Sequence, residues 1–327
     1  MGVASIPLID LAVATPQDVA DALMVSSCAF VTGHGVPSSV HDDMVTLSRS
    51  FFDLPRGEKA EVRWPGDRYW RGWLPYYEGP EDLKGSQSPE LVEKFEVQLA
   101  HPWPGTDDAS ILGRTADFDC WPLRPEGFRL VWGRYYAALG GLTSRILTMI
   151  AEALDLPSDQ LDVWCDNQYA NLVVNNYLAQ VEPPKPGQIR IRAHTDLGGL
   201  TMLWADDAPG GLQVRLPGTP GWTDVQIPAG AYLIQAGDVL SCWTNHRIRP
   251  NIHRVANPDR EQAADSRRMS IVYFHYPQLD AVVEPAPSCV TAEHPACQPL
   301  SGGSQLRRAV ERPAERYAEL ELAYSQL

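Results

Sequence analysis

A histidine and an aspartate two residues apart form the most informative pair in the sequence. His194 and Asp196 lie in the strand-like run IRIRAHTDLGGLTML, and side chains along a strand alternate between its two faces. Both side chains should therefore point the same way, where an imidazole and a carboxylate can supply two ligands of a metal. A second histidine from another strand would complete a two-histidine, one-carboxylate triad, which leaves three positions open on Fe(II).

Three of the eight histidines are candidates for the third ligand. His253 lies in PNIHRV, where an apolar β-type run begins after a turn-rich stretch. His246 lies in the turn-like TNHRIRP, and His275 lies in the strand-like YFHYP but is followed closely by Pro277. The local pattern favours His253 and leaves the other two open.

The elements that must position these residues change character along the chain. Residues 127–155 carry the strongest helical period of apolar residues, which predicts a scaffold helix packed on a sheet. Between 170 and 280, short β-type runs alternate with Gly, Pro and Asp turns, as in an all-β sandwich or barrel. We expect a mainly β fold with flanking helices, divided into a mixed N-terminal region (1–105), a connector with the scaffold helix (106–169), a core (170–280) and a helical tail (281–327).

The composition limits the partners that this chain can have. Its 327 residues include 27 Lys and Arg against 41 Asp and Glu, a net charge of −14, which argues against nucleic acid or an anionic membrane. No uncharged apolar run approaches the roughly 18–20 residues of a membrane span, and no signal-peptide pattern is visible. The six cysteines form no CxxC motif, so we expect reduced cysteines in a cytoplasmic protein.

Several motifs, in order along the chain, resemble those of one family. The segments are HTDLGGLTMLWADDAPGGLQV, GWTDVQIPAGAYLIQAGDVLSCWTNHRIRPNIHRV and RMSIVYFHYP, preceded by IPLIDLA, CAFVTGHGVP and the WRGW region. Over roughly residues 5–280 the chain resembles the non-haem Fe(II), 2-oxoglutarate-dependent oxygenases of the isopenicillin N synthase-like family. The resemblance implies a double-stranded β-helix (jelly-roll) core. It also implies that Fe(II) is bound by His194, Asp196 and His253, with no catalytic residue beyond the metal centre.

The same resemblance implies a pocket for 2-oxoglutarate. Arg268 and Ser270 match the family's RxS motif. The guanidinium of this arginine can bind the carboxylate of 2-oxoglutarate that lies far from the metal, with two hydrogen bonds. VNNYLAQ resembles the family's NYYP strand, so Asn175 and Tyr177 should contact 2-oxoglutarate, although Leu178 replaces the usual proline. Arg268 follows the distal histidine by 15 residues, where about ten are usual in the family, so NPDREQAADSR should form a longer hairpin loop.

The activity implied by the resemblance couples decarboxylation of 2-oxoglutarate, to succinate and CO2, with oxidation of a small organic molecule by O2. Ascorbate can serve as reductant. Hydroxylation is the default outcome, with desaturation, cyclisation or epoxidation as variants, and bacterial members commonly act in secondary metabolism. The enzyme would be a monomer or a homodimer. The alternatives are an iron oxidase of the same fold that does not use 2-oxoglutarate, of the isopenicillin N synthase or aminocyclopropane carboxylate oxidase type, and a non-catalytic jelly-roll binding module.

The residues that would recognise the substrate are harder to identify from the sequence. Arg190 and Arg192 share parity with His194, so a regular strand would turn both toward the barrel interior. Arg192 would then meet an anionic group of the substrate, such as a carboxylate, pair with a core carboxylate, or extend its charged end to the barrel mouth. Aromatic residues also gather between 69 and 77, where the family's N-terminal segment covers the pocket. The expected pocket walls are Tyr77, Trp73, Trp243, Phe274 and Leu203.

Overall fold

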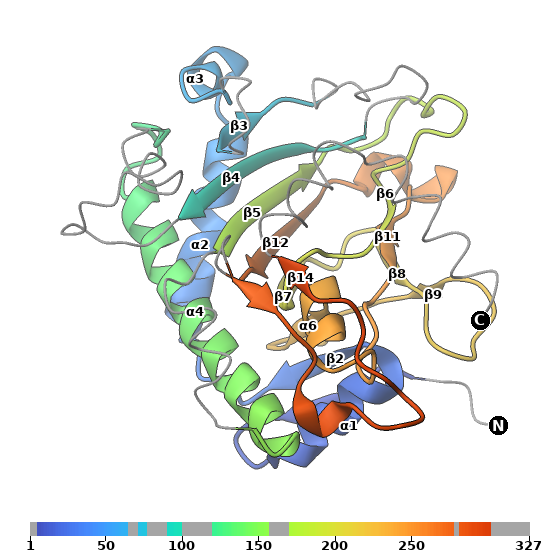
Figure 1. Cartoon of the computed structure of the whole chain (residues 1–327). Coiled ribbons are helices and arrows are strands. Elements are labelled where there is room, and N and C mark those ends of the chain that lie inside the picture. The colour runs from blue at the N-terminus through green and yellow to red at the C-terminus, as the bar shows by residue number, and fades with distance from the viewer. Residues whose placement is uncertain are drawn as a thin grey trace.

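The computed structural model describes residues 5–64, 71–76, 90–99, 120–156, 170–277 and 281–301. Of the tail predicted to be helical (281–327), residues 281–301 are described and form two short strands and a 3-10 helix, whereas residues 302–327 and Tyr77 lie outside the described residues. Along the chain (Figure 1) the elements are β1 (Leu8–Asp10), α1 (Pro16–Ser26), β2 (Cys28–Thr32), α2 (Ser38–Phe52), α3 (Arg56–Ala60), β3 (Gly72–Leu74), β4 (Glu93–Leu99), α4 (Phe128–Ala153), β5 (Ala170–Tyr177), β6 (Ile191–His194), β7 (Leu200–Ala205), β8 (Leu212–Val214), β9 (Thr223–Asp224), β10 (Tyr232–Ala236), α6 (Asp238–Trp243), β11 (His253–Val255), the 3-10 helix η1 (Arg260–Asp265), β12 (Arg268–His275), β13 (Val282–Val283), the 3-10 helix η2 (Pro287–Cys289) and β14 (Leu300–Ser301).

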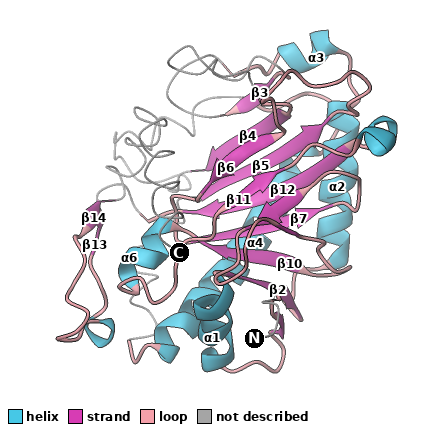
Figure 2. Cartoon of the chain, turned by 90° about the vertical axis from the view of Figure 1, so that its right-hand side faces the viewer, coloured by secondary structure: helices cyan, strands magenta, loops and turns pink. Residues whose placement is uncertain are grey.

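Two β-sheets pack face to face and form the core. In the described part of the chain, the larger sheet has the strand order β1-β2-β10-β7-β12-β5-β4-β3, of which β2 to β3 are labelled in Figure 2, and the smaller has the order β6-β11-β8-β9 (Figure 1). Leu203, Leu233 and Val272 of the larger sheet are buried in one cluster with Leu212 and Val214 of the smaller. The predicted mainly β jelly-roll fold is confirmed.

The other face of the larger sheet is covered by helices, which in Figure 1 run along one side of the molecule. The helix predicted for 127–155 is confirmed as α4, whose apolar stripe is buried against the sheet. Phe95 of β4 has its ring centre 5.1 Å from that of Phe128 and 5.0 Å from that of Trp132, both on α4. Glu93, Phe95 and Val97 of β4 therefore face the helices, and Lys94 and Glu96 face the smaller sheet.

The N-terminal part of the chain contributes strands to both edges of the larger sheet. β1 pairs in parallel with β2, which joins the sheet at β10, whereas β3 and β4 extend it beyond β5. The helices of this N-terminal part include α1 and α2. The division of the chain into four regions stays a prediction.

Helix α6 and the 3-10 helix η1 are among the elements that were not anticipated from the sequence. Helix α6 follows β10 directly, and η1 occupies part of the stretch expected to be a hairpin loop. The start of α6 depends on a close approach of two glycines, since a Cβ on Gly237 would lie 2.2 Å from the carbonyl oxygen of Gly198. Among the described residues, no helix combines the length and apolar character that a membrane crossing requires.

Candidate metal centre and its surroundings

His194, Asp196 and His253 form a compact group whose candidate ligand atoms lie within 4.8 Å of one another. His194 ends β6 and His253 begins β11, and the two residues are direct partners across the strand pair. The Nε2 atom of each imidazole lies 3.7 Å from Asp196 Oδ1. Two nitrogens and one carboxylate oxygen thus converge on a single point between the strands.

Hydrogen bonds on the outer side of the group fix the orientation of all three side chains. His194 Nδ1 lies 2.8 Å from the carbonyl oxygen of Arg192, and His253 Nδ1 lies 3.2 Å from that of Asn251. Because a carbonyl only accepts, each Nδ1 donates its hydrogen to it, and each Nε2 is the ring nitrogen that can offer a lone pair to a metal. Asp196 Oδ2 accepts a hydrogen bond from Thr201 Oγ1 at 2.6 Å, which leaves Oδ1 facing the imidazoles.

The loop after Asp196 is held against β12 by backbone contacts. Gly199 N–H donates to the carbonyl oxygen of His275, and a Cβ on Gly198 would lie 2.1 Å from that oxygen. The sequence DLGGLT therefore allows a close passage of the chain at 198, followed by β7, which carries Thr201.

The other two histidine candidates lie elsewhere. His246 has a positive φ in the turn after α6, and its Nδ1 lies 3.0 Å from Ser241 Oγ. His275 is buried at the end of β12, and burial lowers the pKa of its imidazole to about 4. Within the described residues, His253 is the histidine that the fold brings to His194 and Asp196.

A second polar group lies on the face of the larger sheet that is turned toward the smaller sheet, which is also the face that carries Thr201. Arg268 pairs with Tyr177 and Ser270 with Asn175 across β12 and β5, and all four side chains are buried. Asn175 Nδ2 donates to Ser270 Oγ at 3.2 Å, and the Tyr177 hydroxyl lies 3.4 Å from the same oxygen. In the described part of the chain, no carboxylate forms an ion pair with Arg268. A buried guanidinium without a carboxylate partner suits an anionic ligand.

Comparison with known proteins decides the family. Residues 169–277 match the model of the 2OG-Fe(II) oxygenase superfamily, and residues 6–122 match that of the N-terminal region of non-haem dioxygenases in morphine synthesis. Validamycin A dioxygenase of Streptomyces hygroscopicus subsp. limoneus is 30% identical over 295 residues, which cover 86% of this chain and 79% of that protein. This chain belongs to the 2OG-Fe(II) oxygenase superfamily.

Solved structures agree with this fold. The rice dioxygenase for auxin oxidation has a TM-score of 0.71 at 26% identity, with 94% of this chain and 95% of that chain covered. A family protein from Caulobacter crescentus has a TM-score of 0.80 at 23% identity, with 94% and 99% covered. The chain is thus an Fe(II)- and 2-oxoglutarate-dependent oxygenase, and the resemblance noted from its sequence is confirmed.

The two arginines before His194 do not lie as a regular strand would place them. The register of β6 with β11 shifts between the pair His194–His253 and the pair Ile191–Val255, so strict alternation fails here. Arg190 precedes β6, is fully buried and donates to the carbonyl oxygens of Pro209, Gly210 and Ser266. Burial lowers its pKa to about 10, an effect that the neighbouring Tyr177 opposes.

Arg192 contributes to the oxygenase through its backbone. Its carbonyl oxygen orients His194, and its N–H donates to Glu90 Oε1 at 2.8 Å. The residue is half-buried and has further interactions beyond these two. A role for the Arg192 side chain in substrate binding stays a prediction.

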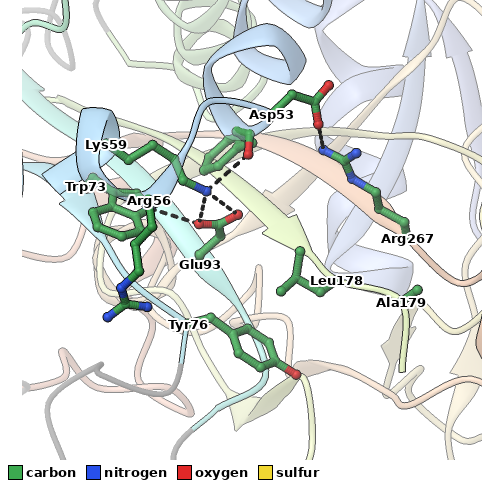
Figure 3. A pocket seen from close by; sticks show the side chains of 10 residues that line it. Asp53, Arg56, Lys59, Trp73, Tyr76, Glu93, Leu178, Ala179 and Arg267 are labelled. Carbon is green, nitrogen blue, oxygen red and sulfur yellow. Dashed lines mark hydrogen bonds and ion pairs between the residues drawn. The ribbon is translucent and has the colours of Figure 1, made fainter. Parts of the chain in front are cut away.

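The expected wall residues divide between the two faces of the larger sheet. Leu203 and Phe274 belong to the cluster between the sheets, on the face that carries Thr201 and Arg268. Trp73 lies on the opposite face, where its Nε1 donates to Glu93 in a pocket that Lys59 also lines (Figure 3). Trp243 lies in α6, inside the main hydrophobic core with α4. The structure therefore does not bring Trp73 and Trp243 together with the triad.

Thr201 was not anticipated as part of the site. It lies five residues after Asp196, at the second position of β7, and its hydroxyl is buried against that carboxylate. The only sequence signal is a hydroxyl residue at the start of the strand that follows HTDLGG, and such a pattern is too common to select it.

Proposed function

We propose that this oxygenase hydroxylates, or desaturates or cyclises, a small organic molecule in secondary metabolism, with release of succinate and CO2. The observation that carries the proposal is the convergence of His194, Asp196 and His253, on the same side of the larger sheet as the buried Arg268. The names of the relatives support a small organic substrate, since one acts on validamycin A and another oxidises auxin. A substrate carboxylate, and the choice between monomer and homodimer, stay predictions.

In this proposal the triad holds Fe(II). Two neutral imidazoles and one carboxylate are the donor set of non-haem Fe(II) oxygenases, which leaves sites for the cosubstrate and O2. When bound, the metal supplies the activation of O2 that oxidises the C–H bond. The protein keeps both Nε2 lone pairs directed at the metal position through the carbonyls of Arg192 and Asn251, and Thr201 orients the carboxylate.

The second polar group binds 2-oxoglutarate. The Arg268 guanidinium receives the far carboxylate of the cosubstrate, and Ser270 Oγ donates to it or accepts from Asn175 and Tyr177. These groups are buried between the sheets, so water competes little with the carboxylate for them. Together they set the distance of the cosubstrate's 2-oxo acid end from the triad.

The decisive assay measures Fe(II) binding and succinate formation with 2-oxoglutarate, ascorbate and a panel of small molecules. His253→Ala should lose stoichiometric iron and succinate formation, whereas His246→Ala should keep both. Arg268→Met should retain iron but raise the KM for 2-oxoglutarate by roughly 10- to 150-fold, as expected for a lost charged hydrogen bond. O2 consumption without succinate would instead indicate an oxidase, and full activity of the His253→Ala variant would contradict the assigned triad.

A further inference from the structure

Two buried glutamates lie three residues apart on β4, so they face opposite sides of the larger sheet. Glu93 faces the helices and is fully paired. Its carboxylate lies 2.9 Å from Lys59 Nζ, and it accepts hydrogen bonds from Trp73 Nε1 at 2.9 Å and Asn176 Nδ2 at 2.7 Å. Figure 3 shows Lys59 and Trp73 converging on this carboxylate. Glu93 therefore has a structural explanation that is complete within the chain.

Glu96 has no comparable set of partners. It is only 7% exposed, and in the described part of the chain its one hydrogen bond comes from Asn171 Nδ2. Burial raises the pKa of this carboxyl, and the hydrogen bond from Asn171 and the charge of Lys94, two residues earlier on the same face, lower it only in part. Asn171 is also 7% exposed, and its Oδ1 has no hydrogen-bond partner among the described residues. Asn171 Nδ2 donates to Oε1 of this carboxylate, so Glu96 Oε2 and Asn171 Oδ1 are the two acceptors that have no donor among the described residues.

The register of the sheet relates this pair to the metal centre. Thr201, which donates to Asp196, lies directly opposite Phe274 of β12, and Phe274 lies directly opposite Asn171 of β5. Each step across the sheet is about 4.8 Å, so Asn171 lies roughly 10 Å from Thr201 along the same face. That separation matches the length of a small organic molecule whose other end is at the iron.

We propose that Glu96 and Asn171 bind a protonated amine of the substrate, so that the oxygenase acts on small molecules that carry a basic nitrogen. An ammonium has two or three N–H donors and a positive charge, which match two acceptors and one buried carboxylate. A substrate carboxylate placed there would be repelled, and a neutral hydroxyl would leave the charge of Glu96 uncompensated. This inference rests on the proposed function, because it assigns the far end of the same site.

The test measures binding by NMR titration of the metal-free protein, so no turnover is needed. The probes are benzylamine, 2-phenylethylamine, cyclohexylamine and piperidine, each beside an alcohol and a carboxylate of similar shape. At least one amine should bind roughly 10-fold more tightly than its alcohol, and the carboxylates should bind most weakly. Glu96→Gln should weaken amine binding by roughly 10- to 150-fold and leave alcohol binding within about twofold.

Glu93→Gln is the matched control, since it changes a buried glutamate of the same strand on the opposite face. Its preference for amines should equal that of the unchanged protein. Asn171→Leu should also weaken amine binding, and this second variant keeps the test valid if Glu96→Gln fails to fold. Absence of binding by every amine, equal binding of amines and alcohols, or unchanged binding in the Glu96→Gln variant would each overturn the inference.

The failure of the inference and that of the proposed function are distinguishable. Fe(II) and 2-oxoglutarate binding are titrated separately in the same variants by calorimetry. If both bind and no amine preference is found, only the inference fails. If an amine binds at Glu96 but Fe(II) and 2-oxoglutarate do not bind, the proposed function fails.

Discussion

The guanidinium carbon of Arg190 lies 5.3 Å from the ring centre of Tyr177, and the guanidinium carbon of Arg268 lies 5.7 Å from the same centre. Tyr177 is therefore the shared neighbour of two buried cations with different tasks. Arg268 has no carboxylate partner in the described residues, whereas Arg190 is held by three backbone carbonyls from segments at 209–210 and 266. Arg190 thus connects Tyr177, which lies beside Ser270, to the segments at 209–210 and 266.

Replacing Arg190 by lysine should affect both stability and cosubstrate binding. The planar guanidinium of Arg190 donates to three backbone carbonyl oxygens and contacts the ring of Tyr177. A lysine ammonium cannot make all of these contacts, so the free energy of unfolding should fall by about 2–4 kcal/mol. Because Tyr177 loses its neighbour, the KM for 2-oxoglutarate should rise several-fold while kcat changes less. Urea unfolding and succinate formation measure the two effects. The control is Arg267→Lys, at an exposed arginine paired with Asp53, and an unchanged KM in Arg190→Lys would limit Arg190 to a structural role.

Replacing Thr201 by valine should weaken iron binding without unfolding the protein. Valine keeps the shape of threonine but removes the 2.6 Å hydrogen bond that orients Asp196. Loss of such an outer contact typically lowers metal affinity by about 10- to 100-fold. Competitive titration of Fe(II) with a chelator measures the change, and Thr201→Ser, which retains the hydroxyl, should restore most of the affinity. Equal affinity in all three proteins would show that the contact has no influence on the metal.

His275 should make the protein less stable as the solution becomes acidic. Its pKa is about 4 in the folded protein because burial disfavours the charged imidazole, against 6.5 as the ordinary value. Between these values the unfolded chain binds more protons, so stability is complete above about pH 6.5 and falls as the pH drops toward 4, by up to about 3 kcal/mol. Denaturant unfolding at several pH values should show a smaller loss for His275→Leu. His41, whose pKa is also lowered by burial, should leave a residual slope.

Removing Lys59 should be far more damaging than removing an exposed lysine. Lys59 Nζ lies 2.9 Å from Glu93 Oε2 and donates to the carbonyl oxygen of Phe52, with the side chain almost entirely buried. Lys59→Met should therefore cost about 3–5 kcal/mol, because it leaves a buried carboxylate without its cation. Lys94→Met should cost less than about 1 kcal/mol, since Lys94 is partly exposed and lies 4.0 Å from Glu90. Thermal unfolding of the two variants gives the comparison.

The sequence was sufficient for local features and less so for those that depend on distant partners. His194 and Asp196 could be placed on one face because alternation acts within a few residues. The orientation of Arg190 could not, because the register shift that breaks the alternation is set by β11, some sixty residues later. Trp73 and Trp243 were expected near the substrate from their place in the chain, but their faces depend on the packing of Phe95 and of α6.

The order of strands in the larger sheet also sets the order in which the chain can fold. β1 and β3, both three residues long, form its two edges, and neither β2 nor β4 has its inner neighbour until β10 and β5 have been synthesised. During translation β2 and β4 therefore emerge with one edge of unpaired backbone donors and acceptors, and the pairing of these edges must wait for β10 and β5, which follow roughly 200 and roughly 70 residues later. A fragment that begins at residue 170 would have the opposite defect, because β5 and β10 would become open edges prone to aggregation.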